Sequence, residues 1–114
     1  MISFTNLTSK SIPRSIFVRI YKKIFSQKDM ELSVVFAPPS LMRKLNRERR
    51  GKDKVANVLS FLLDKNLGEI FLNRNEKNLP YLFVHGCLHL KGYDHENEVD
   101  MGKMERLEDK ILNS

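Results

Sequence analysis

Residues 85–95 read HGCLHLKGYDH and contain every histidine of the chain: His85, His89 and His95. Residues four apart lie on one face of a helix, so His85 and His89 can point ring nitrogens at a single position. Gly92 stands where a helix can end through a left-handed residue, and the chain can then turn back to bring in His95. The stretch therefore predicts a helix and turn that hold one metal ion with three imidazoles.

Three protein ligands leave one coordination position for water or substrate, which is typical of a catalytic zinc site. The HxxxHxxGxxH spacing is also that of the metzincin metalloproteases, but their glutamate base after the first histidine is replaced here by Gly86. The alternative without a metal is a chance cluster of surface or capping histidines. The lack of any other histidine and the placement of Gly92 favour the metal. Zinc is the expected ion, and nickel or another divalent metal would also fit.

The composition indicates one globular domain over residues 1–114. The chain is 41% hydrophobic and 30% charged, in the range of ordinary soluble proteins. No apolar stretch approaches the roughly 20 residues that span a bilayer, and the N-terminus lacks the apolar run of a signal peptide. A single cysteine, Cys87, forms no internal disulfide. We therefore expect a cytoplasmic protein without a membrane partner.

The net charge of +6 is concentrated in the first half of the chain. Residues 1–54 hold thirteen basic and four acidic residues, whereas residues 55–114 hold seven basic and ten acidic ones. The densest basic segment is LMRKLNRERRGKDK at residues 41–54, which a polyanion would attract. A solvated helix face followed by a basic loop explains this segment equally well by itself. Beside a metal site, the balance favours a nucleic acid with a phosphodiester bond as substrate.

The hydrophobic pattern predicts an α+β fold, with a small mixed sheet packed against helices. Three strands are expected at residues 31–37, 55–63 and 68–72, where β-branched and aromatic residues cluster. Apolar residues at helical spacing predict four helices, at residues 11–26, at a short segment capped by Ser40, at residues 78–91 and at residues 98–112. On the helix at 78–91, Phe83, Cys87 and Leu90 should pack on the sheet while the histidines face a cleft.

HGCLHLKGYDH, with LNRERRGKDKVANVLSF at residues 45–61 and LGEI at residues 67–70, resembles the YbeY family of bacterial endoribonucleases, also called rRNA maturation factors. The matching segments run in order from about residue 41 to residue 95. The chain departs from the family pattern at Arg49, where the family has tyrosine, and at Glu69, where it has aspartate. The VAN of residues 55–57 also replaces the family's PTD.

The resemblance implies a metal-dependent, single-strand-specific endoribonuclease that acts in 16S rRNA 3′ end maturation and ribosome quality control. It implies one zinc ion on His85, His89 and His95, and it matches Arg50 to a functionally important arginine. The implied partners are rRNA in the small ribosomal subunit, with ribosomal or ribosome-associated proteins possible. Oligomeric state and general base stay open. Asp94 could orient an imidazole or cap a turn, and Glu69 could approach the metal from its strand, although an ordinary edge residue is favoured.

Two rival interpretations remain from the sequence. The chain could be an RNA-binding ribosome assembly factor whose zinc only stabilises the fold, because no general base is evident. It could also be a small metalloprotease, against which Gly86 argues. On the favoured interpretation the metal polarises the scissile phosphate or its bound water, and Arg50 clamps the phosphate while Lys52 and its basic neighbours hold flanking RNA.

Overall fold

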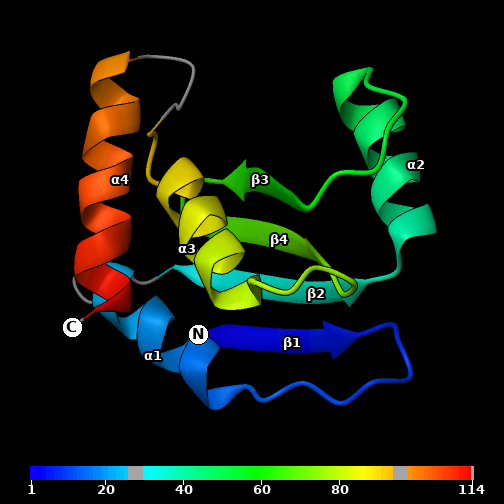
Figure 1. Ribbon diagram of the computed structural model, residues 1–114, viewed down its shortest axis with the longest axis horizontal. Helices are drawn as coiled ribbons and strands as arrows, with labels where there is room; N and C mark the ends of the chain where they lie inside the picture. Colours follow the sequence, from blue (N-terminus) through cyan, green and yellow to red (C-terminus); the bar gives the residue numbers. More distant parts are fainter. Residues whose placement is uncertain (26–29, 94–97, 114) are drawn as a thin grey trace.

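The computed structural model describes residues 1–25, 30–93 and 98–113, and it contains an α+β fold (Figure 1). The elements follow in the order β1 (Ile2–Asn6), α1 (Ser15–Ile24), β2 (Glu31–Ala37), α2 (Pro39–Arg50), β3 (Val58–Asp64), β4 (Leu67–Asn73), α3 (Leu79–Leu90) and α4 (Glu98–Leu112). No helix in these three ranges is long and apolar enough to span a bilayer.

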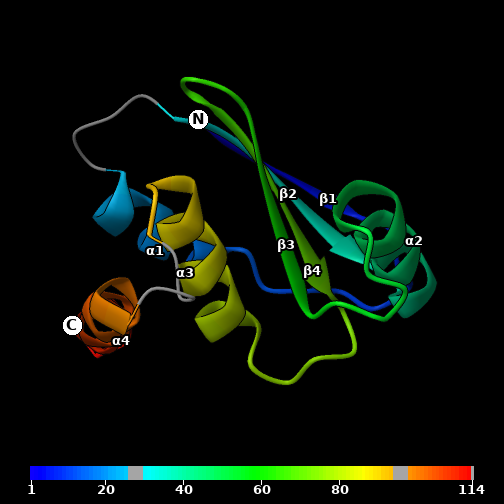
Figure 2. The same ribbon diagram turned by 90° about the horizontal axis from the view of Figure 1, so that it is seen from above.

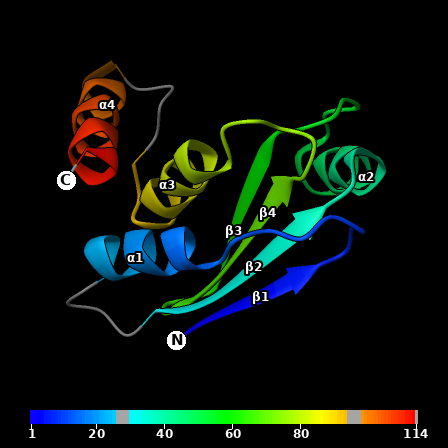
Figure 3. The same cartoon turned by 60° about the horizontal axis from the view of Figure 1, so that its bottom comes forward.

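The four strands form one mixed sheet in the order β1-β2-β4-β3 (Figure 3). β1 and β4 both run parallel to β2, whereas β3 returns antiparallel to β4 through the turn at residues 65–66. β3 is an edge strand, and it therefore leaves one side of its backbone without a neighbouring strand. This open edge is the floor of the cleft described below.

Helices cover both faces of the sheet (Figure 2). One face packs against α1 and α3 through a core built on Phe17, Phe36, Ile70 and Phe83, and α4 packs on the outside of α1 and α3. The other face carries α2 over a smaller cluster that includes Met42 and five other buried residues, Val35, Ala37, Leu45, Leu59 and Phe71. Side chains alternate between the faces along each strand, so neighbouring residues of β3 and β4 meet different helices.

The predicted class of fold is confirmed, and the boundaries differ in informative ways. The helix at 78–91 is found as α3, and the strand at 31–37 is found as β2. β1 was not predicted, and it raises the sheet from three strands to four. The prediction of a short helix capped by Ser40 was wrong in both length and cap. α2 is 12 residues long, and Pro38 is its N-cap. β3 begins at Val58, three residues later than expected.

Candidate metal centre and basic cleft

α3 holds two of the predicted metal ligands on its outer side. Pro80 occupies the first turn, where its missing N–H costs no hydrogen bond. Phe83 and Cys87 are buried against the sheet side as predicted, while His85 and His89 line the cleft. Complete burial raises the pKa of the Cys87 thiol well above its usual range, so Cys87 is a core residue with no role as ligand or nucleophile.

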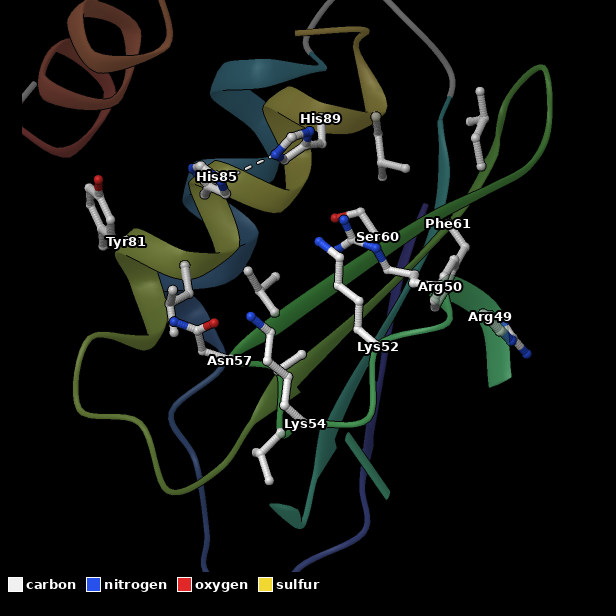
Figure 4. A pocket seen from close by; sticks show the side chains of 16 residues that line it. Arg49, Arg50, Lys52, Lys54, Asn57, Ser60, Phe61, Tyr81, His85 and His89 are labelled. Atoms are coloured by element: carbon white, nitrogen blue, oxygen red, sulfur yellow. Dashed lines mark hydrogen bonds between the residues drawn. The ribbon is translucent and has the colours of Figure 1, made fainter. Parts of the chain in front are cut away.

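The two histidine rings converge through their Nε2 atoms, which lie 3.2 Å apart (Figure 4). Two nitrogens bound at about 2.0–2.1 Å to one tetrahedral ion are separated by roughly 3.3 Å, so the pair fits a zinc ion placed between them. The ring centroids are 4.7 Å apart and the planes are inclined by 73°. This convergence of His85 and His89 is what the spacing of four residues predicted.

The third predicted ligand, His95, lies outside the described residues, as does Asp94. Within the residues that are described, no group of three metal-ligating side chains is found. The turn that leads toward His95 is present up to Tyr93. Gly92 has φ of 99°, its N–H donates to the His89 carbonyl at 2.9 Å, and the Tyr93 N–H donates to the Leu88 carbonyl at 3.1 Å. These two bonds form a Schellman motif, which ends α3 where the glycine predicted.

A carboxylate from α4 lies behind the first histidine. Glu108 Oε1 is 3.3 Å from His85 Nδ1, on the side of the ring away from His89. Glu108 is only 3% exposed, and it also raises the pKa of the Tyr81 phenol, chiefly by hydrogen bonding and then by burial. The second carboxylate oxygen, Glu108 Oε2, has no hydrogen-bond partner within the described part of the chain.

Gly86 explains why the protease base is missing. A Cβ atom at this position would lie 2.9 Å from Ser60 Oγ and 3.2 Å from Ile70 Cγ2, so α3 rests directly on β3 and β4 there. The Ser60 hydroxyl donates to the Gly86 carbonyl at 3.1 Å. Any carboxylate at position 86 would point into this contact instead of the cleft. The packing therefore leaves no room for the protease glutamate at this position.

The histidines open onto a cleft of about 920 Å³ between α3, the edge strand β3 and the connection from α2 to β3. Figure 4 shows Arg50, Lys52 and Lys54 extending toward the side of the cleft that carries the histidines, whereas Arg49 points away from it. We call these three basic residues, Arg50, Lys52 and Lys54, the cationic wall of the cleft. Arg50 thus lies in the same cleft as His85 and His89, although it is the last residue of α2 and not part of a loop.

The cationic wall is held in place by contacts around the end of α2. Gly51 adopts φ of 69° and ends the helix. The buried Asn46 side chain donates to the Lys54 carbonyl at 3.0 Å, which ties the connection back to α2. Arg43 makes a two-pronged ion pair with Asp53, at 3.0 and 3.3 Å, and this pair lowers the pKa of Asp53. The basic residues therefore project from an ordered segment.

Glu69 belongs to the opposite face of the sheet from the histidines. Its carboxylate lies 3.6 Å from Arg49 Nη1, and the guanidinium of Arg49 stacks 4.6 Å from the centroid of the Phe61 ring. Glu69 is therefore a strand residue that pairs with Arg49 and not a metal-site residue, as favoured from the sequence, but the expected edge position is wrong because β4 lies between β2 and β3. Arg49, where the family has tyrosine, holds its guanidinium on this opposite face.

Sequence reasoning missed Glu108, Tyr81 and Ser60. Along residues 98–112 the spacing of Met104, Leu107 and Ile111 defines an apolar side, and this pattern leaves Glu108 on the polar side of the expected helix. Its partner His85 is 23 residues away on another helix, and no local pattern reports such a contact. The spacing of Tyr81 and His85 by four residues on one helix was the single available signal for Tyr81.

An α+β fold with a pair of converging imidazoles at the floor of a cationic cleft defines a protein equipped to act on a polyanion. The family model "Endoribonuclease YbeY" matches residues 3–114, and the chain belongs to this family. The match extends well beyond the segments on which the resemblance was based.

Individual relatives support this assignment. Endoribonuclease YbeY of Chelativorans sp. (strain BNC1) is 41% identical, over 73% of this chain and 64% of the relative. Endoribonuclease YbeY of Sulfurihydrogenibium sp. (strain YO3AOP1) is 37% identical, over 91% of this chain and 84% of the relative. Endoribonuclease YbeY of Phytoplasma australiense is 33% identical, over 97% of this chain and 92% of the relative. The chain thus spans about two thirds of the length of some relatives and nearly all of others.

A solved structure supports the fold alone. The solution structure of TM1509 from Thermotoga maritima superposes with a TM-score of 0.65 at 21% identity, over 99% of this chain and 90% of that chain. The arrangement of sheet and helices described above is therefore shared with an experimentally determined protein.

Proposed function

We propose that this protein is a metal-dependent endoribonuclease that cleaves single-stranded RNA and acts in 16S rRNA 3′ end maturation and ribosome quality control. The observation that carries the proposal is the position of His85 and His89 opposite Arg50 in one cleft. Family membership supports the activity, and the rRNA substrate rests on the resemblance of the motifs. The proposed setting is the cytoplasm, on the small ribosomal subunit and with ribosome-associated proteins as possible partners.

His85, His89 and His95 are the residues that would hold the ion, with zinc the best fit and nickel or another divalent metal also accepted. When bound, the ion supplies Lewis acidity toward a phosphoryl oxygen and lowers the pKa of coordinated water. The chain itself contributes the positioning. His85 and His89 lie on one side of α3 with their Nε2 atoms 3.2 Å apart, which supports the proposal that they are two of the three ligands.

Arg50 is proposed to bind the scissile phosphate. A guanidinium offers paired N–H donors that match two phosphate oxygens, and negative charge grows on those oxygens in the transition state. Arg50 ends α2 beside Gly51, so it stands at the rim of the cleft facing α3. Lys52 and Lys54 are proposed to hold the flanking phosphates.

An exposed aromatic ring in the cleft supports a single-stranded substrate. Tyr81 is 41% exposed and lines the cleft together with His85. An exposed ring can stack on bases that are free of a duplex, whereas paired bases are already stacked on each other. A cleft with a cationic wall and an exposed ring therefore suits an unpaired strand.

The test is cleavage of a defined 16S rRNA 3′ fragment by purified protein, with and without a chelator. The variants His89→Ala and Arg50→Ala should both fold and bind RNA, while cleavage falls at least 100-fold for His89→Ala, because the ion is lost. Arg50→Ala should reduce the rate with a smaller effect on affinity. Elemental analysis of the purified protein identifies the ion.

The same assay tests the rivals. Cleavage by His89→Ala at the wild-type rate would contradict the proposed endoribonuclease activity. It would favour an RNA-binding assembly factor whose zinc only stabilises the fold. Hydrolysis of casein with no cleavage of RNA would indicate a protease, although the packing at Gly86 opposes it. Equal cleavage of a duplex and of an unpaired strand would contradict single-strand specificity.

A further inference from the structure

Glu108 is the one buried carboxylate among the side chains whose burial the structure describes. Burying a charged group without a partner is costly, so its surroundings should compensate. Glu108 Oε1 lies 3.3 Å from His85 Nδ1, and the Tyr81 phenol is a further polar neighbour of the carboxylate. This carboxylate is therefore tied to a predicted metal ligand and not to the surface of α4.

The position of Glu108 is set by packing that does not involve an ion. Met104, one turn earlier on α4, is 1% exposed within the main core. Near the end of α4, Lys23 of α1 donates to the Ile111 carbonyl at 3.2 Å. These contacts fix α4 against α1 and α3 on both sides of Glu108. The carboxylate is thus in place before a metal is bound.

The contact affects which nitrogen of His85 carries the proton. When the carboxylate is ionised it can only accept a hydrogen bond, and the contact then favours the form of His85 whose Nδ1–H donates to Glu108. A neutral imidazole carries one proton, and Nε2 is then left with its lone pair. That Nε2 atom lies 3.2 Å from Nε2 of His89, on the side where the ion fits.

We propose that Glu108 is a positioning residue that holds His85 in the tautomer protonated at Nδ1, so that α4 is part of the metal centre. The inference rests on the proposed metal site and extends it to a residue 13 positions beyond His95. Carboxylates behind metal-bound histidines fix the ring and increase its basicity, and their loss usually weakens metal binding by about 10- to 100-fold.

The experiment measures the tautomer and the metal separately. In metal-free protein, two-dimensional ¹H–¹⁵N spectra of the imidazole rings report the protonated nitrogen of His85. Zinc affinity is then measured by competition with a chromogenic chelator. The variants are Glu108→Leu, which removes the acceptor at similar volume, and Glu108→Gln, which keeps an acceptor oxygen without the charge. Glu105→Gln, on an exposed position of α4, is the matched control.

We expect Glu108→Leu to give a mixture of His85 tautomers and a loss of zinc affinity of about 10- to 100-fold. Glu108→Gln should retain the Nδ1–H tautomer of His85 and lose about tenfold in zinc affinity. If the leucine variant does not fold, the zinc affinity of the glutamine variant alone tests the inference. Glu105→Gln should match the wild type. Wild-type zinc affinity in both Glu108 variants would overturn the inference.

Failure of the proposed function gives a different pattern. Wild-type protein that binds no zinc would remove the metal site, whereas the spectra of metal-free protein would still show whether Glu108 sets the tautomer of His85. Wild-type protein that binds zinc and variants that bind it equally well would remove the role of Glu108 alone.

Discussion

Single residues at the contact of α3 with the sheet control how closely the histidines approach the cleft floor. Gly86 allows α3 to rest on Ser60 and Ile70, and the Ser60 hydroxyl bonds the Gly86 carbonyl. A helix that stood farther from the sheet would move His85 and His89 away from the edge strand β3. The absence of a side chain at position 86 is therefore a requirement of the site's geometry.

Gly86→Ala tests this requirement. The new methyl group would clash with Ser60 Oγ and with the fully buried Ile70, so we expect a loss of about 1–3 kcal/mol in the free energy of unfolding. Gly102→Ala in α4 is the control, because nothing lies within 4 Å of the added Cβ, and better helix propensity should stabilise by up to about 1 kcal/mol. Urea titration measures both, and equal effects of the two substitutions would contradict the close packing at Gly86.

The Arg43–Asp53 pair gives a pH-dependent contribution at one residue. The hydrogen bond from Arg43 is the largest cause that lowers the pKa of Asp53 in the folded state. The pair therefore stabilises the fold above the unfolded pKa of about 4, and this stabilisation is lost as the pH falls through the folded pKa. Asp53→Asn should therefore lower Tm slightly at pH 7 and make no difference in strong acid. Thermal scans between these limits give the profile. Arg43→Gln should reproduce it, and a constant difference at every pH would rule the pair out.

Two helix ends shape the site at the scale of elements. α3 ends at Gly92 and directs the chain toward His95, while α2 ends at Gly51 and directs it into Lys52 and Lys54. Both glycines have positive φ, where any other residue is strained. One turn thus follows the helix that carries the proposed ligands His85 and His89, and the other leads into the cationic wall.

Alanine at each turn should separate the two functions. Gly92→Ala and Gly51→Ala should each cost about 1–2 kcal/mol locally, since both impose a left-handed conformation on an L-residue. We expect Gly92→Ala to weaken zinc binding while RNA affinity is kept, and Gly51→Ala to weaken RNA binding while zinc affinity is kept. Chelator competition and fluorescence anisotropy measure the two affinities, and each variant is the control of the other.

The elements that sequence predicted well are those with a strong local signal. α3 combines histidines four apart, a proline in the first turn and a following glycine, and its extent was correct within one residue at each end. β1 has only five residues with alternating burial, and its place in the sheet depends on pairing with β2. α2 was predicted too short because its last turn is all polar and basic, although Gly51 marked its end.

The candidate site was predictable in part for the same reason. His85 and His89 meet because they share one helix, and Arg50 was assigned through a motif. That Arg50 faces them, and that Glu108 lies behind His85, depends on how α2 and α4 are placed by the sheet and by α1. Such contacts between distant segments leave no periodic trace in the sequence.

The whole molecule divides its charge between opposite ends. α2 carries five basic residues and one acidic residue, whereas α4 carries five acidic and three basic residues. Figure 1 shows these helices on opposite sides of the sheet, with α3 and β3, which line the cleft, between them. Attraction of RNA should therefore depend on the cationic wall more than on the total charge of +6.

Salt dependence tests this distribution. Each phosphate neutralised on a single strand contributes a slope of about 0.7 to the fall of log affinity with log salt concentration. Changing both Lys52 and Lys54 to glutamine should lower this slope by about 1.4. The control changes the exposed Lys22 and Lys103 to glutamine, away from the cleft, and should leave the slope near the wild-type value. Equal slopes in the two double variants would show that binding follows total charge.

The separation of α2 from α4 also gives the molecule an electric dipole moment. In the field of a polyanion this dipole exerts a torque, which turns the α2 side forward during diffusion and before any contact forms. Encounters should then begin with the cleft already facing the strand, so that a larger share of collisions is productive. The uneven charge of the chain thereby acts on the rate of capture as well as on its strength.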